Sequence, residues 1–232
     1  MQWLLWLAAF GFLIALALFP VSYRITRVIS LALVFAVWLG LISIVWRQRL
    51  LRYGLLGITL LAAVFLALPS RGSPPTETLR ADYIAGLLRY EGVRYYWGGE
   101  TARGIDCSGL VRRGLIDALL RCGLRTLDAG LVRQAIGFWW HDCTASALGE
   151  QHRSLTVHVL DTPSVNALDY SKVLPGDLAV TTGGVHVMAY LGNHRWIEAD
   201  PGAGRVITVA APSRDNSWFH GPMNIVRWSI LQ

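Results

Sequence analysis

Residues 104–111 of the chain, Gly-Ile-Asp-Cys-Ser-Gly-Leu-Val, decide how its C-terminal part folds. Asp106 is a residue of the type that caps helix N-termini, and Cys107 follows it directly. Beyond the cysteine, apolar residues recur with the spacing of one buried helix face, at Leu110, Val111, Leu115, Ala118 and Leu119. The pattern predicts a helix from residue 107 to about residue 121.

Cys107 occupies the first turn of this predicted helix. Backbone N–H groups are unpaired there and the helix dipole is positive, so the environment favours the thiolate, which is the nucleophilic form. A small buried cysteine that only fills space in the core is the alternative interpretation. The helix position alone does not separate the two.

Three further segments accompany the cysteine block: Tyr-Tyr-Trp-Gly-Gly at 95–99, Pro-Gly-Asp-Leu-Ala-Val at 175–180, and Gly-Gly-Val-His-Val-Met-Ala-Tyr-Leu-Gly-Asn at 183–193. Taken in their order along the chain, the four blocks resemble the NlpC/P60 family of cell-wall cysteine peptidases. The resemblance covers roughly residues 79–209, with an unmatched stretch in the middle. The resemblance implies a papain-like α+β domain, in which helices pack on an antiparallel β-meander. It implies no metal ion and no cofactor.

By that resemblance Cys107 is the nucleophile and His186 is the general base. Tyr95 would supply a hydroxyl that helps the backbone N–H of Cys107 to hold the oxyanion. Asp106 and Ser108 match residues that in relatives contact the free amine end of the substrate peptide. From its position alone, Asp106 is also expected to cap the helix.

His186 is one of six histidines, and it lies in an alternating segment that predicts a strand. A histidine inside a strand is more often structural, so its role as base depends on the resemblance. The family usually places His, Asn or Gln twelve residues after the base, and this chain has Glu198 there. A hairpin would bring even-numbered residues of the next strand across from His186, which makes Glu198 the expected orienting group and Asp200 its rival. An ordinary exposed acid at a strand end is the remaining alternative.

The positive charge of the chain lies in its N-terminal third. Six of the 21 basic residues precede Glu77, the first acidic residue, so the remaining 15 balance the 15 acidic residues. The six arginines flank apolar runs and form no basic face on a folded domain. We therefore expect no nucleic-acid partner.

The N-terminal third also predicts a membrane region. Residues 1–23, 28–46 and 53–70 are predominantly apolar and carry no charge. A helix of about 20 apolar residues crosses a bilayer, so we expect about three transmembrane helices within residues 1–69, surrounded by membrane lipid. A cleaved signal peptide is an alternative for the first run, but that run has no basic segment before it and a second run follows at once.

The Pro/Gly/Ser-rich residues 70–77 predict a linker, and residues 78–232 are then the NlpC/P60-like catalytic domain. Three arginines fall on each side of the predicted membrane region, so charge does not fix its orientation. Because the substrate of the family lies outside the cytoplasm, we expect a multi-pass protein of the cell (inner) membrane. Its catalytic domain would face the periplasm or the cell exterior.

Within the domain, residues 79–90 predict a helix, and strands are expected near residues 154–160, 177–181, 185–191, 195–198, 205–209 and 224–230. Residues 122–174 are the hardest to interpret. The apolar cluster at 138–140, Phe-Trp-Trp, is either core or a lid over the groove. Cys122 and Cys143 lack the spacing of a zinc site, and they are either buried thiols or a disulfide.

The expected function is that of a cysteine endopeptidase, a peptidoglycan hydrolase that cuts an amide bond in peptidoglycan stem peptides. The expected bond joins D-γ-glutamate to a diamino acid. Two alternatives stay open: an amidase or acyltransferase of the same fold that acts on another substrate, and a wall-binding scaffold with a degenerate site.

Overall fold

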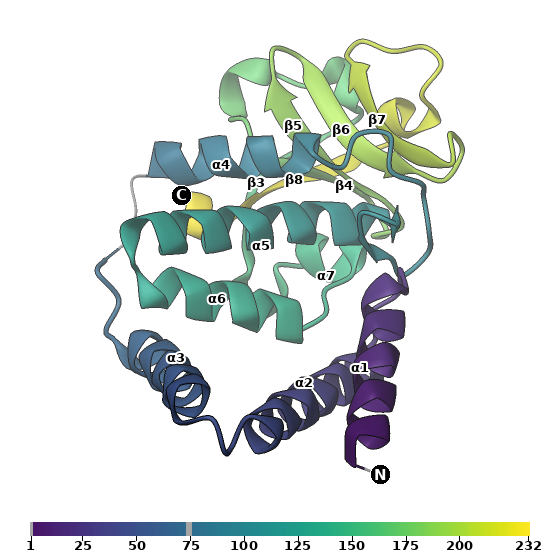
Figure 1. Cartoon of the computed structure of the whole chain (residues 1–232). Helices are drawn as coiled ribbons and strands as arrows, with labels where there is room; N and C mark the ends of the chain where they lie inside the picture. Colours follow the sequence, from purple (N-terminus) through teal and green to yellow (C-terminus); the bar gives the residue numbers. More distant parts are fainter. Residues whose placement is uncertain (1, 73–75) are drawn as a thin grey trace.

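The computed structural model describes residues 2–72 and 76–232. Part of the predicted linker, residues 73–75, therefore lies outside the described residues. The chain forms an N-terminal group of apolar helices followed by an α+β domain (Figure 1). The fold class expected from the sequence is confirmed.

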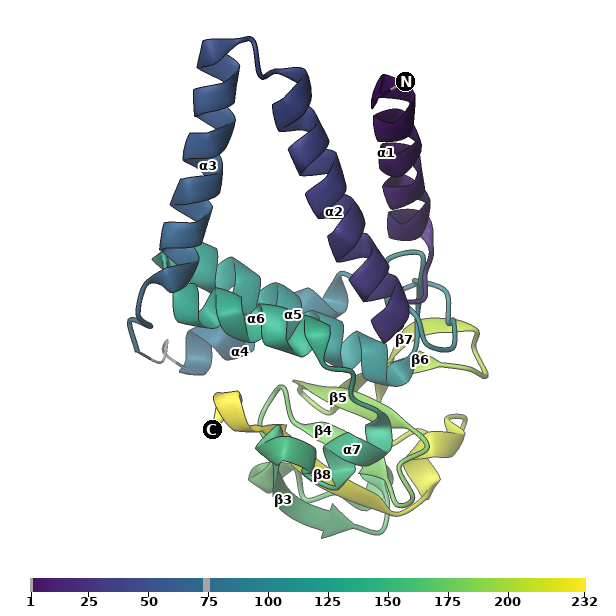
Figure 2. The same ribbon diagram turned by 90° about the horizontal axis from the view of Figure 1, so that it is seen from below.

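The N-terminal helices are α1 (Gln2–Leu18), α2 (Arg24–Ile44) and α3 (Arg49–Ala67). They extend from one side of the domain, with the turns that follow α1 and α3 next to the domain and the turn between α2 and α3 at the far end (Figure 2). By length and composition α2 and α3 could cross a membrane, whereas α1, with 17 residues, is shorter. The expectation of three spans remains a prediction, with α2 and α3 as its candidates.

The helices of the domain lie side by side in one layer: α4 (Thr76–Leu88), α5 (Cys107–Thr126) and α6 (Ala129–Trp140) (Figure 1). Helices α4 and α5 pack closely because glycines meet where they touch: a Cβ on Gly86 would lie 2.9 Å from the carbonyl oxygen of Gly114. The short pair β1 (Glu100–Thr101) and β2 (Gly104–Ile105) leads into α5, and α7 (Ala145–Gly149) follows α6.

The sheet is antiparallel and six-stranded, in the order β3-β8-β4-β5-β6-β7. Its strands are β3 (Thr156–Thr162), β4 (Leu178–Thr181), β5 (Val187–Gly192), β6 (Arg195–Asp200), β7 (Arg205–Ala210) and β8 (Met223–Trp228). Short 3₁₀ helices lie before, between and after these strands, namely η1 (His152–Ser154), η2 (Val165–Ala167), η3 (Tyr170–Lys172), η4 (Ser217–His220) and η5 (Ser229–Leu231).

The two faces of the sheet bury different residues. One face packs against α4 and α5 and contributes Val187, Ala189 and Ile197 to the main core. The other face buries Met188 and Trp196, the even-numbered neighbours, in a second core under the connecting segments. Successive residues of a strand point to opposite faces, so Glu198 of β6 shares the face of Trp196.

Asp177 of the Pro-Gly-Asp block holds strands together. Its fully buried carboxylate accepts hydrogen bonds from Arg227 Nε at 2.6 Å and Nη2 at 2.8 Å, and from the backbone N–H of Leu174 at 2.8 Å. This two-pronged ion pair ties the start of β4 to β8. The aspartate of this motif is structural.

Helix α5 is five residues longer than predicted, ending at Thr126 where residue 121 was expected. The predicted break near Cys122 was wrong because Gly123 serves packing: a Cβ there would lie 2.9 Å from Val132 Cγ2 of α6. The helix is capped after Thr126 by Leu127, whose backbone is left-handed at φ 52°.

Residues 138–140 belong to the end of α6, and Phe138 packs edge-on against Trp228 with ring centroids 5.7 Å apart. Phe138 and Trp139 pack against the main core, as the core interpretation expects, whereas Trp140 is partly buried outside the two core clusters of the described residues. Among the described residues Cys122 and Cys143 are buried free thiols, so the disulfide alternative was wrong.

Candidate active site

Asp106 fixes the start of α5 and with it the position of Cys107. Its Oδ1 accepts hydrogen bonds from the backbone N–H of Gly109 at 2.6 Å and from Ser108 Oγ at 3.0 Å, and its Oδ2 accepts one from Gly98 N–H at 2.8 Å. The capping role expected of Asp106 is confirmed. Both carboxylate oxygens serve protein donors, so substrate contact by Asp106 and Ser108 stays a prediction.

Two glycines of the motifs allow the loop before α5 to close on the helix. A Cβ on Gly109 would collide with the carbonyl oxygen of Gly99, and a Cβ on Gly99 would collide with that of Gly104. Glycine at these positions removes the clash. The glycines of the sequence blocks around Cys107 therefore allow the loop before α5 to pack closely on the start of the helix, where Cys107 lies.

His186 lies one residue before β5, and not inside it as predicted. Its backbone is held by Thr181, whose hydroxyl accepts from the N–H of His186 at 2.9 Å and whose N–H donates to the His186 carbonyl at 3.0 Å. This short loop is the reason why the strand begins later. It leaves the His186 side chain at the border between sheet and helices.

The imidazole of His186 meets Glu198 of β6. His186 Nε2 and Glu198 Oε2 are 2.5 Å apart, and the two side chains are 2% and 0% exposed. Asp200, the rival candidate, instead binds the following turn through Gly202 N–H at 2.8 Å and Ala203 N–H at 3.2 Å. Of the two acids, Glu198 is the one that contacts His186.

Two further residues complete this cluster, and neither was predicted from the sequence. Asn216 Nδ2 donates a short hydrogen bond to Glu198 Oε1, while its Oδ1 accepts from the backbone N–H of Trp218 at 2.9 Å. The Trp218 ring stacks on His186 with centroids 4.2 Å apart. Residues 213–218 look like an ordinary turn rich in polar residues, and only the fold brings them back to β6.

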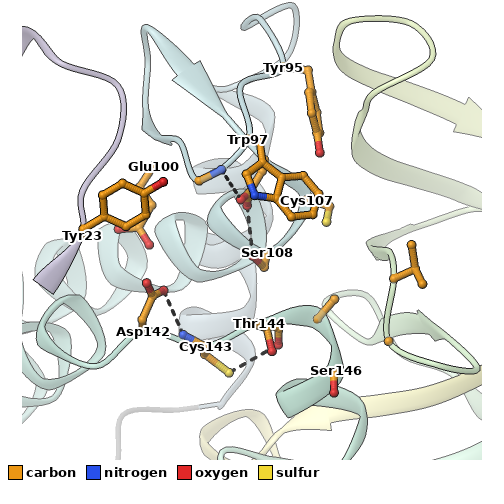
Figure 3. A pocket seen from close by; sticks show the side chains of 15 residues that line it. Tyr23, Tyr95, Trp97, Glu100, Cys107, Ser108, Asp142, Cys143, Thr144 and Ser146 are labelled. Atoms are coloured by element: carbon orange, nitrogen blue, oxygen red, sulfur yellow. Dashed lines mark hydrogen bonds between the residues drawn. The ribbon is translucent and has the colours of Figure 1, made fainter.

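Cys107, Tyr95 and the loop before His186 surround one pocket of about 520 Å³. Gly184 and Val185, the residues just before His186, line it together with Asp106. Ser108 lines it on the side of Cys107 (Figure 3). Burial raises the pKa of Tyr95 to about 12, and the nearby Cys107 and Asp106 add to this rise. Tyr95 therefore keeps its proton and can donate a hydrogen bond at neutral pH.

His186 is charged at neutral pH. Burial alone would lower its pKa, but hydrogen bonds and charge from Cys107 and Glu198 outweigh that effect and raise the pKa to about 9. The pKa of His186 responds to Cys107, so the thiol and the imidazole lie near each other. The structure thus brings together Cys107, His186 and Glu198, from the start of α5, the start of β5 and the end of β6.

This pKa predicts a pH dependence of stability. A folded-state value of about 9 against 6.5 for the free side chain means that the folded protein holds the His186 proton more tightly than the unfolded chain does. The resulting stabilisation is fully present below pH 6.5 and is lost as the pH rises through 9. Thermal unfolding of the full chain and of His186→Asn, measured from pH 6 to 10, should show a difference in midpoint that shrinks across this window. A difference that stays constant would contradict the assignment of the charge to His186.

Comparison with known proteins identifies the family of the domain. Residues 92–221 match the model of the NlpC/P60 family, and this range includes Tyr95, Cys107, His186 and Glu198. No curated protein sequence matches the chain.

Solved structures with a similar fold include the peptidoglycan hydrolase RipB of Mycobacterium tuberculosis, at 23% identity and a TM-score of 0.41, with 66% of this chain and 65% of RipB covered. The P60 domain of a Mycobacterium avium subspecies paratuberculosis antigen shows 21% identity and a TM-score of 0.40, covering 68% of this chain and 98% of that domain. The NlpC/P60 domain of the peptidoglycan hydrolase SagA shows 22% identity and a TM-score of 0.38, covering 64% of this chain and 97% of that domain.

The family model spans more than half of the chain and contains the whole cysteine, histidine and carboxylate cluster. The chain therefore belongs to the NlpC/P60 family of cell-wall hydrolases.

Proposed function

We propose that this protein is a cysteine endopeptidase that cleaves an amide bond in peptidoglycan stem peptides, between D-γ-glutamate and a diamino acid. The observation that carries the proposal is the placement of Cys107, at the N-terminus of α5, near the His186 imidazole, which contacts the buried Glu198. A thiolate beside an imidazolium is the reactive form of a cysteine nucleophile. The neighbouring pocket is open and large enough for a peptide segment.

In the first half of the reaction the Cys107 thiolate attacks the carbonyl carbon of the scissile amide. The oxyanion that forms is held by the Tyr95 hydroxyl and by the backbone N–H of Cys107. The His186 imidazolium gives its proton to the leaving amine, the C–N bond breaks, and a thioester to Cys107 remains.

In the second half neutral His186 takes a proton from water, and the resulting hydroxide adds to the thioester carbonyl. The C–S bond then breaks and releases the new carboxylic acid, and the sulfur leaves as thiolate beside the recharged imidazolium. Glu198 keeps the imidazole oriented through both steps and stabilises its charged form.

The proposal places the enzyme in the cell membrane, with its catalytic domain on the outer side. Turns after α1 and α3 lie next to the domain, and the turn between α2 and α3, which carries Arg47, lies at the far end (Figure 2). With α1 as a third span, the domain and the N-terminus would lie on opposite sides of the bilayer. Peptidoglycan, the substrate class of the family, is then on the side of the domain.

The test is to digest purified peptidoglycan with the detergent-solubilised full chain and to identify the released peptides by mass. The proposal expects products that end in D-γ-glutamate and products that begin with the free amine of a diamino acid. Cleavage at any other bond would overturn the proposed specificity. No released peptide from intact, folded protein would overturn peptidoglycan hydrolysis itself.

A further inference from the structure

The segment between α1 and α2 lies against the loop that leads to Cys107. The backbone N–H of Glu100 donates to the carbonyl of Pro20 at 3.1 Å, and Val21 forms an antiparallel bridge with Gly99. Val21 is buried in the process. A segment that the sequence assigns to the membrane region thus adds a short extended strand to the edge of the catalytic domain.

Arg27 of α2 anchors this segment through a buried ion pair. Its side chain is 1% exposed, and its Nη2 lies 2.9 Å from Glu100 Oε2. Its Nε donates to Ser22 Oγ at 3.0 Å and its Nη1 to the carbonyl of Trp140 at 3.3 Å. Since an unpaired buried charge is costly, Arg27 requires Glu100 as its partner.

Further ion pairs connect Glu100 to the wall of the pocket. Glu100 Oε1 also contacts Arg112 of α5, and Arg112 in turn contacts Asp142. Glu100 and Asp142 line the pocket that contains Cys107. Two arginines and two acids therefore form one neutral row from the start of α2 to the wall of the pocket.

Tyr23 is the residue of this segment that reaches the pocket itself. It lines the same cavity as Cys107 and remains 57% exposed (Figure 3). Its hydroxyl lies 3.5 Å from where a Cβ on Gly98 would be, so it borders the turn that Asp106 caps. Trp97, also on the pocket wall, is 74% exposed. Exposed aromatic rings on a pocket wall offer contact area to a ligand at low cost in conformational entropy.

We propose that the α1–α2 segment is a working part of the substrate site: Tyr23 contacts the bound stem peptide, and the Arg27–Glu100 pair holds Tyr23 in place. Tyr23 and Arg27 lie outside residues 92–221, so this wall of the pocket is not part of the matched family domain. The proposal rests on the proposed peptidoglycan hydrolysis and adds a specificity-determining residue to it.

The experiment uses the full chain in detergent and measures kcat and KM on a soluble stem-peptide fragment. Tyr23→Ala should raise KM about tenfold and change kcat little, because it removes binding contacts that are the same in ground state and transition state. Tyr23→Phe keeps the ring and should behave like wild type. The matched control is Tyr53→Ala, which removes an equally exposed tyrosine (62%) from α3, away from the pocket.

Arg27→Met tests the anchoring role. It should raise KM as Tyr23→Ala does, and Tyr23→Ala should then add little in the Arg27→Met background, because the ring has already lost its position. A full additional loss in that background would overturn the anchoring role.

A wild-type KM for Tyr23→Ala, with the wild-type chain active, would overturn the contact while leaving the proposed function intact. A wild-type chain that cleaves no stem peptide would overturn both. The two failures are therefore distinguishable by the activity of the wild-type chain alone.

Discussion

Cys107→Ala is expected to lower the rate of peptide release from peptidoglycan at least about 10⁴-fold, by analogy with the loss of other catalytic nucleophiles. Without the sulfur no thioester forms, and the oxyanion donors and the binding pocket alone give little acceleration. The fold should persist because the change removes one nearly buried sulfur atom and leaves the Asp106 cap intact. Release of peptides is measured by chromatography and mass, and folding by the thermal midpoint.

Cys122→Ala provides the matched control for that experiment. Cys122 lies on the same helix and is also a buried free thiol, but it does not line the pocket. Its replacement should leave the rate at the wild-type value. A Cys107→Ala protein that still releases peptides at the wild-type rate would rule out the thiol as nucleophile.

Glu198→Gln is expected to lower kcat about 10²- to 10⁴-fold, although the family accepts Gln at this position, because the second oxygen of Glu198 here accepts from Asn216. Glu198 accepts hydrogen bonds on both oxygens, from His186 and from Asn216. A glutamine has one acceptor and one donor end, so it must fail one of the two partners. If the glutamine NH₂ faces His186, it donates to the imidazole, which must then adopt the wrong tautomer. If the NH₂ faces Asn216, it meets the Asn216 NH₂, and two donors oppose each other.

Asn216 cannot turn to relieve this conflict, because its Oδ1 accepts from the Trp218 N–H at 2.9 Å. Asn216→Asp should relieve it, since a carboxylate accepts from both the glutamine NH₂ and the Trp218 N–H. The double variant Glu198→Gln/Asn216→Asp should therefore be at least about tenfold more active than Glu198→Gln alone. Asn216→Asp by itself should be impaired, because two carboxylates would face each other. A double variant no more active than Glu198→Gln would show that Asn216 does not act through position 198.

Most of the domain could be predicted because its elements carry local patterns. The strands follow alternating runs between Gly, Pro and Asn turns, and each lies within a few residues of its predicted place. Errors occurred where a distant partner overrides the local pattern. Helix α5 continues through Gly123 because α6 packs against it there, and β5 starts after His186 because Thr181 binds that backbone.

The same limit applies to the candidate site. The cysteine, histidine and tyrosine could be named because they stand in recognisable blocks. Glu198 could be named because it stands twelve residues after His186, where the family has its orienting group, and because hairpin strands fix which residues share a face. Asn216 and Trp218 could not, since nothing near them in the sequence indicates contact with β6. Arg27 looked like a charge that flanks a membrane span, and its partner Glu100 lies 73 residues away.

The two points of attachment between the helices and the domain determine how far the enzyme can reach. A flexible eight-residue linker could let a domain range about 28 Å from its anchor. Here Val21 pairs with Gly99 at one end of the helical region, and Ser70 and Arg71 bind the Asp128 carboxylate at the other. The two attachments therefore keep the sulfur of Cys107 at a fixed distance from the start of α2. If α2 crosses the bilayer, Cys107 can reach only the peptidoglycan next to the membrane. The outer layers of the cell wall then lie beyond its reach.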